Sequence, residues 1–168
     1  MRYVVSMAYD VRALANFVLD LAAKDGRSLT NMQINKVVYF LHVDFLVEFA
    51  RPLVSAKIEA WEHGPVFREL YAQFKRHGDT GIASQAVAVN PETGQAAKVV
   101  YSLQIDEESF LTPLARRYSS MSAAVLRAQS HVVGGPWDRV WNHDTTTNAT
   151  MRITDDAILD WYGRSAKH

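Results

Sequence analysis

Residues 29–49, LTNMQINKVVYFLHVDFLVEF, decide the fold because they predict one long helix that is apolar on most of its faces. The helix begins with a capping box, in which the Thr30 hydroxyl accepts the N–H of Gln33 and the Gln33 side chain bonds back. Its main apolar stripe consists of Ile34, Val38, Leu41, Phe45 and Phe49. Arg51-Pro52 marks its end, since proline cannot continue the hydrogen-bond ladder. Because a helix that is apolar all round is a buried one, we expect the other elements to pack around it.

A second amphipathic helix is predicted over residues 9–24, directly before the central one. Its inner stripe is formed by Val11, Leu14, Val18 and Leu21. Gly26 stands where a helix commonly ends. The connection to the central helix is only four or five residues long, which favours two antiparallel neighbours.

Residues 56–63, AKIEAWEH, have the alternation of a short strand, and Gly64-Pro65 breaks it. Pro65 suits the first turn of a helix, so we expect a helix over residues 66–77 that stops at Gly78. Residues 85–103 predict two strands joined by the turn at 90–94. A hairpin alone is marginal in water, so it must either pack on the helices or pair with the strand at 56–63. A three-stranded antiparallel sheet with that strand is the more economical arrangement.

The remainder returns to helices. Asp106 is a candidate cap for a helix to about residue 117, with Pro113 near its start or at a kink, and Ser120 or Ser122 opens another. Pro136 begins a short turn, residues 142–150 form a polar loop, and a final helix follows Thr154. The predicted fold class is therefore α+β, mainly α, with one domain over residues 1–168 and a small antiparallel sheet.

Composition excludes several classes of function. The chain has 168 residues, 18 basic and 18 acidic side chains and no cysteine, so disulfide and thiolate chemistry are absent. The balanced charge gives no reason to expect a nucleic-acid partner. No window approaches a membrane span and Asp10 interrupts the early apolar run, so we expect a cytoplasmic protein without a membrane partner.

The sequence contains no pattern typical of catalysis or cofactor binding. It has no glycine-rich phosphate loop, no HExxH and no GxSxG, and its six histidines fall on different predicted elements. The acidic pairs Glu107-Glu108 and Asp155-Asp156 stand at helix starts, where they complement the helix dipole. We therefore expect no catalytic residue, no metal and no cofactor.

Two places carry unusual clusters of residues. Residues 61–65, WEHGP, are either a strand-to-helix corner with Trp61 in the core or a binding corner in which Gly64 allows close approach. Residues 134–137, GGPW, are either a helix end with Trp137 packed inward or an exposed aromatic anchor. Asn35 and Tyr39 would complete a first candidate site if they lay in a groove beside His63. The candidate partner-binding residues are Asn35, Tyr39, Trp61, His63, Gly64, Pro65, Arg68, Tyr71 and Trp137.

Three segments give the chain a recognisable resemblance. LTNMQINKVVYF at 29–40, EAWEHGPVFRELYAQF at 59–74 and the later SH and PW pairs at 130–131 and 136–137 resemble the Panacea domain family of SocA-like, phage-associated antitoxins. The chain departs from the family pattern at residues 34–35 and 37–38, and residues 132–135 lack its acidic character. The resemblance implies an antitoxin that neutralises a toxin encoded nearby by binding it, without naming that toxin.

Other functions stay open on the residues alone. One is a hydrolase-like enzyme that uses Glu62, His63 and His131 in a groove. Another is an adaptor that delivers its partner to a protease or chaperone. The resemblance places the toxin-binding function first.

Overall fold

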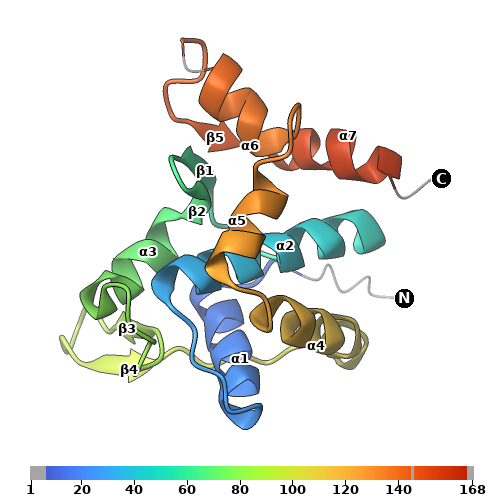
Figure 1. Ribbon diagram of the computed structural model, residues 1–168. Coiled ribbons are helices and arrows are strands. Elements are labelled where there is room, and N and C mark those ends of the chain that lie inside the picture. Colours follow the sequence, from blue (N-terminus) through green and yellow to red (C-terminus); the bar gives the residue numbers. More distant parts are fainter. Residues whose placement is uncertain (1–6, 145, 166–168) are drawn as a thin grey trace.

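The computed structural model describes residues 7–144 and 146–165. Helix α2 (Asn31–Phe49) runs through the middle of the molecule and packs against helices on several sides (Figure 1). Thr30 and Gln33 form the expected capping box, and the side chains of Ile34, Leu41 and Phe45 are fully buried. The prediction of a central buried helix is confirmed.

The other elements surround α2 in a mainly helical fold with small antiparallel sheets, as expected. In chain order they are α1 (Val11–Lys24), β1 (Ile58–Trp61), β2 (Gly64–Phe67), α3 (Arg68–Phe74), η1 (Lys75–His77), β3 (Val87–Val89), β4 (Ala96–Lys98), α4 (Ile105–Ser119), α5 (Ala123–Ser130), α6 (Pro136–Asp138), the π-helical turn η2 (Arg139–His143), β5 (Arg152–Ile153) and α7 (Asp155–Ser165). Helices α1, α4, α5 and α7 each contact α2. None of the helices in the described part of the chain is long and apolar enough to cross a membrane.

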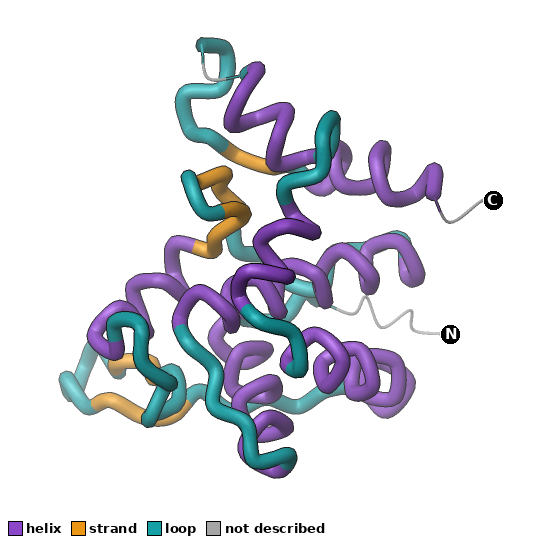
Figure 2. Tube along the Cα trace, in the orientation of Figure 1, coloured by secondary structure: helices purple, strands orange, loops and turns teal. Residues whose placement is uncertain are grey.

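The three-stranded sheet has a different third strand from the one predicted. Its order is β2-β1-β5, so β5 rather than the hairpin at 85–103 pairs with β1. That hairpin exists as β3–β4, but it forms a separate two-stranded sheet (Figure 2). It is held instead by Asn16 of α1, whose side chain bonds the backbones of Ala86 and Val99.

The expected helix start at residue 66, with Pro65 in its first turn, is also wrong. Gly64 and Pro65 begin β2, which pairs with β1 across the two-residue turn at 62–63, and the helix starts only at Arg68. Gly64 has a φ of +115°, a backbone conformation that residues other than glycine rarely adopt. This conformation allows β2 to begin directly after the turn, and Pro65 then lies opposite Ala60 on the sheet.

The second half of the chain follows the predicted order with shifted starts. Helix α4 has Gln104 rather than Asp106 as its N-cap, and it includes Pro113. Helix α5 is capped by the Ser122 hydroxyl, which accepts the N–H of Val125. Thr154 likewise accepts the N–H of Ala157 at the start of the final helix.

Candidate functional site

The β1–β2 hairpin presents the most unusual group of exposed residues. Its tip consists of Glu62 and His63, both exposed, and Trp61 directly before them is half-buried. The strands beneath the tip are largely covered: all four residues of β2 are buried, and so are Ile58 and Ala60 of β1. The hairpin is therefore a short, supported projection.

Helix α2 covers the outer edge of β2 in the way that another strand would. The side-chain oxygen of Asn35 accepts the N–H of Phe67 at 3.0 Å. The next residue, Lys36, donates from its ammonium to the carbonyl of Pro65 at 3.2 Å. Because unpaired backbone groups are costly when buried, these two adjacent side chains fix the position of β2.

The turn is held from the opposite side by the segment that links α5 to α6. The indole N–H of Trp137 donates to the carbonyl of Trp61 at 2.7 Å. The His131 ring stands edge-on to Trp137 with centroids 3.6 Å apart, and it faces the backbone of Glu62. Burial lowers the pKa of His131, and the cationic Lys36 and Arg127 nearby lower it further.

A groove of about 370 Å³, here called the Lys36 groove, opens on one side of Trp61. It lies between the start of α2, the hairpin tip and α3. Its lining residues are Asn31, Met32, Asn35, Lys36, Trp61, Glu62, His63, Val66, Tyr71, Lys75, Gly78 and Asp79. The side chains of Met32 and Tyr71 are exposed at 39% and 42%, whereas Lys36 is only 1% exposed and so lies at the bottom.

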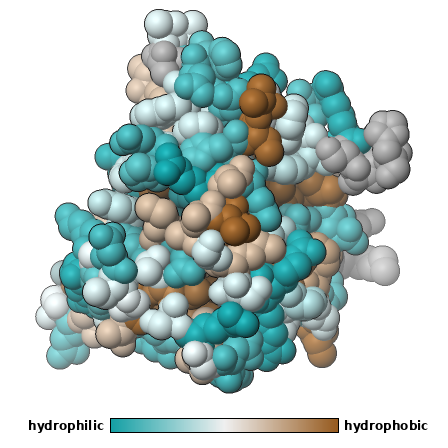
Figure 3. Space-filling view, viewed as in Figure 1, coloured by the Kyte–Doolittle hydropathy of each residue, from teal (hydrophilic) through white to brown (hydrophobic). Residues whose placement is uncertain are grey.

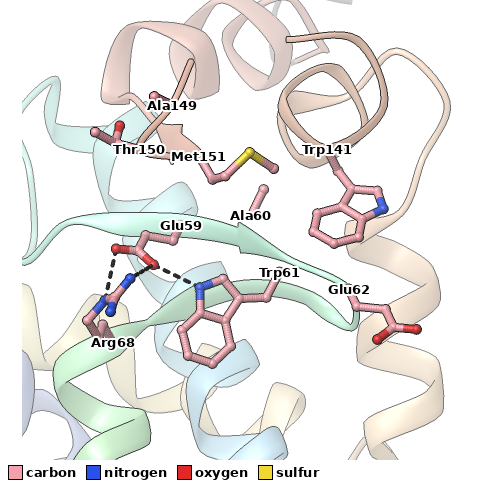
Figure 4. Close-up of a pocket in the computed structure, with 9 residues that line it drawn as sticks. All are labelled: Glu59, Ala60, Trp61, Glu62, Arg68, Trp141, Ala149, Thr150 and Met151. Carbon is pink, nitrogen blue, oxygen red and sulfur yellow. Dashed lines mark hydrogen bonds and ion pairs between the residues drawn. The ribbon is translucent and has the colours of Figure 1, made fainter. Parts of the chain in front are cut away.

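A second, more open hollow of about 580 Å³, here called the Met151 hollow, lies on the other side of Trp61. Figure 4 shows Trp141 and Met151 across from Trp61, with Glu59 and Arg68 at one end. Trp61 and the neighbouring Glu62 line both cavities.

Trp61 is kept in place by its neighbours on the sheet and on α3. Its indole N–H donates to Glu59 at 2.8 Å, and the same carboxylate accepts two hydrogen bonds from Arg68 (Figure 4). Burial alone would raise the pKa of the Glu59 carboxyl, but the bonds from Arg68 and Trp61 hold the pKa below its ordinary value. The ring of Tyr71 packs edge-on against the ring of Trp61, with the ring centroids 5.0 Å apart.

Lys36 is a buried cation that has no counter-ion among the described residues. Burial lowers the pKa of its amine to about 8, and the charge of Arg127 contributes to the shift. Its only hydrogen bond within the described residues goes to the Pro65 carbonyl, and no described acid forms an ion pair with it. The adjacent Gly64 leaves room for this side chain: a Cβ at Gly64 would lie 2.7 Å from Lys36 Cε.

The structure brings most of the predicted binding residues close to this hairpin, but they line two different cavities. Asn35, His63 and Tyr71 line the Lys36 groove, Arg68 lines the Met151 hollow and Trp61 lines both. The remaining predicted residues, Gly64, Pro65, Trp137 and Tyr39, are buried.

The burial of two of these residues decides between alternatives that the sequence left open. Trp137 is 7% exposed, so its side chain is packed inward and is not an exposed anchor. Tyr39 is fully buried beside Phe40 and does not reach the groove with Asn35. Burial raises the pKa of the Tyr39 hydroxyl well above its ordinary value, and Tyr162 of α7 adds to the shift.

Several lining residues were not predicted. Lys36, Met32, Lys75 and Met151 carry no local sequence pattern that marks them as lining residues. They come from three separate segments that meet only in the folded chain, since Met32 and Lys36 share α2. The hypothetical enzyme residues are not gathered in one cavity: Glu62 and His63 line the Lys36 groove, and His131 does not. No group of His, Cys, Asp or Glu suited to a metal ion occurs among the described residues.

A second exposed apolar region lies along α5 and the loop after it. Figure 3 shows apolar residues there on the visible face of the molecule. Its exposed members include Val125, Val132 and Val133, the last at 89%. Unlike the hairpin, this region lines neither the Lys36 groove nor the Met151 hollow, so it serves below as a comparison surface.

The family model described as "Antitoxin SocA-like, Panacea domain" matches residues 34–138. The chain belongs to this family. A relative, antitoxin SocA of Caulobacter vibrioides (strain NA1000 / CB15N), is 36% identical over 152 residues, which cover 90% of this chain and 81% of the relative. No solved structure matches the chain.

The segments that carry the family resemblance meet at the β1–β2 hairpin. The first segment supplies Asn35 and Lys36 on the outer edge of β2. The second is the hairpin itself, and the third supplies His131 and Trp137 behind its tip. Much of the SocA-like pattern is thus explained by the support of one projection.

Proposed function

We propose that this chain is the antitoxin of a toxin–antitoxin pair, acting in the cytoplasm, and that it neutralises its toxin by direct binding without catalysing a reaction. Membership of the SocA-like family and the antitoxin relative support the pairing with a toxin. We expect the toxin gene to lie beside the gene for this chain.

The observation that carries the proposed binding surface is the supported hairpin with its partly exposed aromatic residues. We define the Trp61 face as Met32, Trp61, His63, Arg68 and Tyr71. Tryptophan, tyrosine, arginine and methionine are the residues enriched in protein interfaces, and the first three dominate measured hot spots. On this chain they surround two cavities into which partner side chains can insert.

The support of the hairpin favours affinity. Its strand edges are already bonded to Asn35 and Lys36, and Trp61 is bonded to Glu59. A pre-formed surface loses little conformational entropy on association, so more of the contact energy appears as affinity.

The test is co-expression with the toxin encoded by the neighbouring gene, together with binding by purified proteins. The wild-type chain should restore growth and form a stoichiometric complex. Trp61→Ala and Arg68→Glu should each raise the Kd by about 30-fold, the size expected for hot-spot residues. Arg68 is exposed and its ion pair with Glu59 is at the surface, so its replacement should leave folding intact.

Two control variants match these changes elsewhere on the surface. Arg27→Glu reverses an exposed charge away from both cavities, and Val133→Asp alters the apolar region beyond α5. Both should bind as the wild type does. Unchanged binding by the Trp61-face variants, with loss in Val133→Asp, would move the interface to α5.

The same co-expression separates neutralisation by binding from delivery to a protease. We expect the toxin to persist in the complex, so a pulse-chase should show an unchanged toxin lifetime. A lifetime shortened by the chain would identify an adaptor. Full toxicity and no complex would contradict the antitoxin function itself.

A further inference from the structure

We propose that the Lys36 groove receives an acidic side chain of the toxin, with the Lys36 ammonium as its counter-ion. This inference rests on the toxin-binding function proposed above and names the chemistry of one contact. It follows from the burial of Lys36, the surrounding charges and the apolar walls.

The charge of Lys36 is poorly compensated in the free chain. Its side chain is 1% exposed, and one backbone carbonyl, that of Pro65, accepts from it within the described residues. The ionisable groups that contribute to its environment, Arg127 and His131, are cationic or become so on protonation. A buried ammonium in such surroundings favours an added carboxylate.

The support of β2 does not by itself require a charge. Asn35, one residue earlier, satisfies the N–H of Phe67 on the same strand with a neutral amide. A neutral donor at position 36 would satisfy the Pro65 carbonyl in the same way. The ammonium therefore provides something beyond the support of the hairpin.

The charges at the rim of the groove do not cancel this preference. Lys75, Glu62 and Asp79 also line the groove, but all three are exposed to solvent. Water screens their interactions, whereas a charge at the bottom acts through a medium of lower dielectric constant. An inserted group is therefore selected mainly by Lys36.

The walls fit the stem of an acidic side chain and an apolar neighbour. Met32, Val66, Trp61 and Tyr71 supply apolar surface between the rim and Lys36. The volume of about 370 Å³ lies at the small end of ligand cavities and suits part of a peptide segment. A glutamate or aspartate of the toxin would place methylene groups along these walls and its carboxylate at the ammonium.

The test measures the Kd of the purified toxin for the wild-type chain, Lys36→Met and Lys98→Met. Methionine keeps the unbranched stem and removes the charge, and Lys98→Met makes the same change at an exposed lysine of β4 that lines neither cavity. Lys36→Met should raise the Kd by about 30-fold or more, as expected when one partner of a buried charge pair is lost. Lys98→Met should change it by less than about 3-fold.

A scan of the toxin then identifies the other half of the pair. Its Glu and Asp residues are replaced one at a time by Gln and Asn and tested against the unmodified chain. One replacement should weaken binding about as much as Lys36→Met does. In the Lys36→Met background that same replacement should have little further effect, as a double-mutant cycle requires for a direct contact.

Three results would overturn the inference. One is a Kd for folded Lys36→Met within about 3-fold of the wild-type value. The second is a weakened Lys36→Met for which no toxin acid shows coupling, since the loss would then come from the hairpin support. If Lys36→Met does not fold, the scan of the toxin against the unmodified chain decides alone. The third overturning result is then a scan in which no Glu or Asp replacement in the toxin weakens binding. Wild-type binding that depends on Trp61 and Arg68 shows that the proposed function survives any of these.

Discussion

Two antiparallel hairpins in the described part of the chain, β1–β2 and β3–β4, differ in how their strands are covered. The first has β5 on one edge, and on the other the side chains of Asn35 and Lys36 bond the outer edge of β2. In the second, Gln73 bonds Val87 on β3, and no described side chain bonds the outer edge of β4. All three residues of β4 are exposed.

This difference shows that the surroundings of a hairpin, more than its strands, determine what it can do. A hairpin buried to its turn can hold a large aromatic side chain in one orientation between two cavities, as β1–β2 holds Trp61. The β3–β4 hairpin is fixed at its base by Asn16 but projects small or exposed residues. We therefore assign recognition to the first hairpin and expect the second to tolerate change.

The largest expected contrast is between the glycines of the two turns. Gly64→Ala should lower the free energy of unfolding by about 4 kcal/mol, because it adds backbone strain and a contact of 2.7 Å with Lys36. Gly94 of the second turn has a φ of +70° and nothing near its absent Cβ, so Gly94→Ala should cost about 1 kcal/mol. Urea denaturation measures both. Equal costs would show that the residues packed around Gly64 move to make room for the added methyl group at little cost in free energy.

The next contrast concerns pH. The pKa of Lys36 is about 8 in the folded chain and 10.5 ordinarily, so between these values the unfolded chain holds a proton that the folded chain has lost. Unfolding free energy should therefore rise with pH from about 8 to 10.5, by about 3 kcal/mol relative to Lys36→Met. Tyrosine ionisation contributes equally to the unfolding free energy of both chains, so it cancels in this difference. In Lys98→Met, which changes an exposed residue of β4, the unfolding free energy should depend on pH as it does in the wild type. The same pH dependence in Lys36→Met would show that the Lys36 amine stays protonated in the folded chain.

Local sequence patterns predicted the elements better than their pairing. The capping box at Thr30 and the apolar circumference of α2 arise from neighbouring residues, and both are confirmed. The third strand of the sheet was missed because β5 has only two residues and follows a polar loop. Its pairing with β1 is long-range, and nothing local distinguishes it from the rest of that loop.

The candidate site was predicted in part for the same reason. Trp61 and His63 could be found because a large aromatic, an ionisable residue and a glycine stand together in the sequence. Periodicity placed Tyr39 outside the main apolar stripe of α2 but could not show which side of that helix faces the hairpin. Trp137 looked equally suited to a core and to a surface, and only the packing of His131 and the Trp61 carbonyl against it decides for the core.

A third contrast uses the two asparagines that hold the hairpins. Asn35→Ala and Asn16→Ala each leave buried backbone groups without a partner, so both should lower the free energy of unfolding by about 2 kcal/mol. Only Asn35 supports the Trp61 face. Toxin binding should therefore weaken in folded Asn35→Ala and stay at the wild-type level in folded Asn16→Ala. A similar loss in both would assign binding to overall stability and not to the first hairpin.

The smallest contrast tests the support behind the tip. Trp137→Phe keeps a large ring in the core but removes the N–H that donates to the Trp61 carbonyl, which should cost about 1–2 kcal/mol. Trp161→Phe changes a residue that is 37% exposed and should stay within about 0.5 kcal/mol of the wild type. Thermal and urea unfolding measure the costs, and titration with the toxin shows whether binding follows. Because the lost bond fixes the residue next to the tip, we expect the Kd to rise in Trp137→Phe alone, and an unchanged Kd would mean that β1, β2 and α2 hold Trp61 without help from α6.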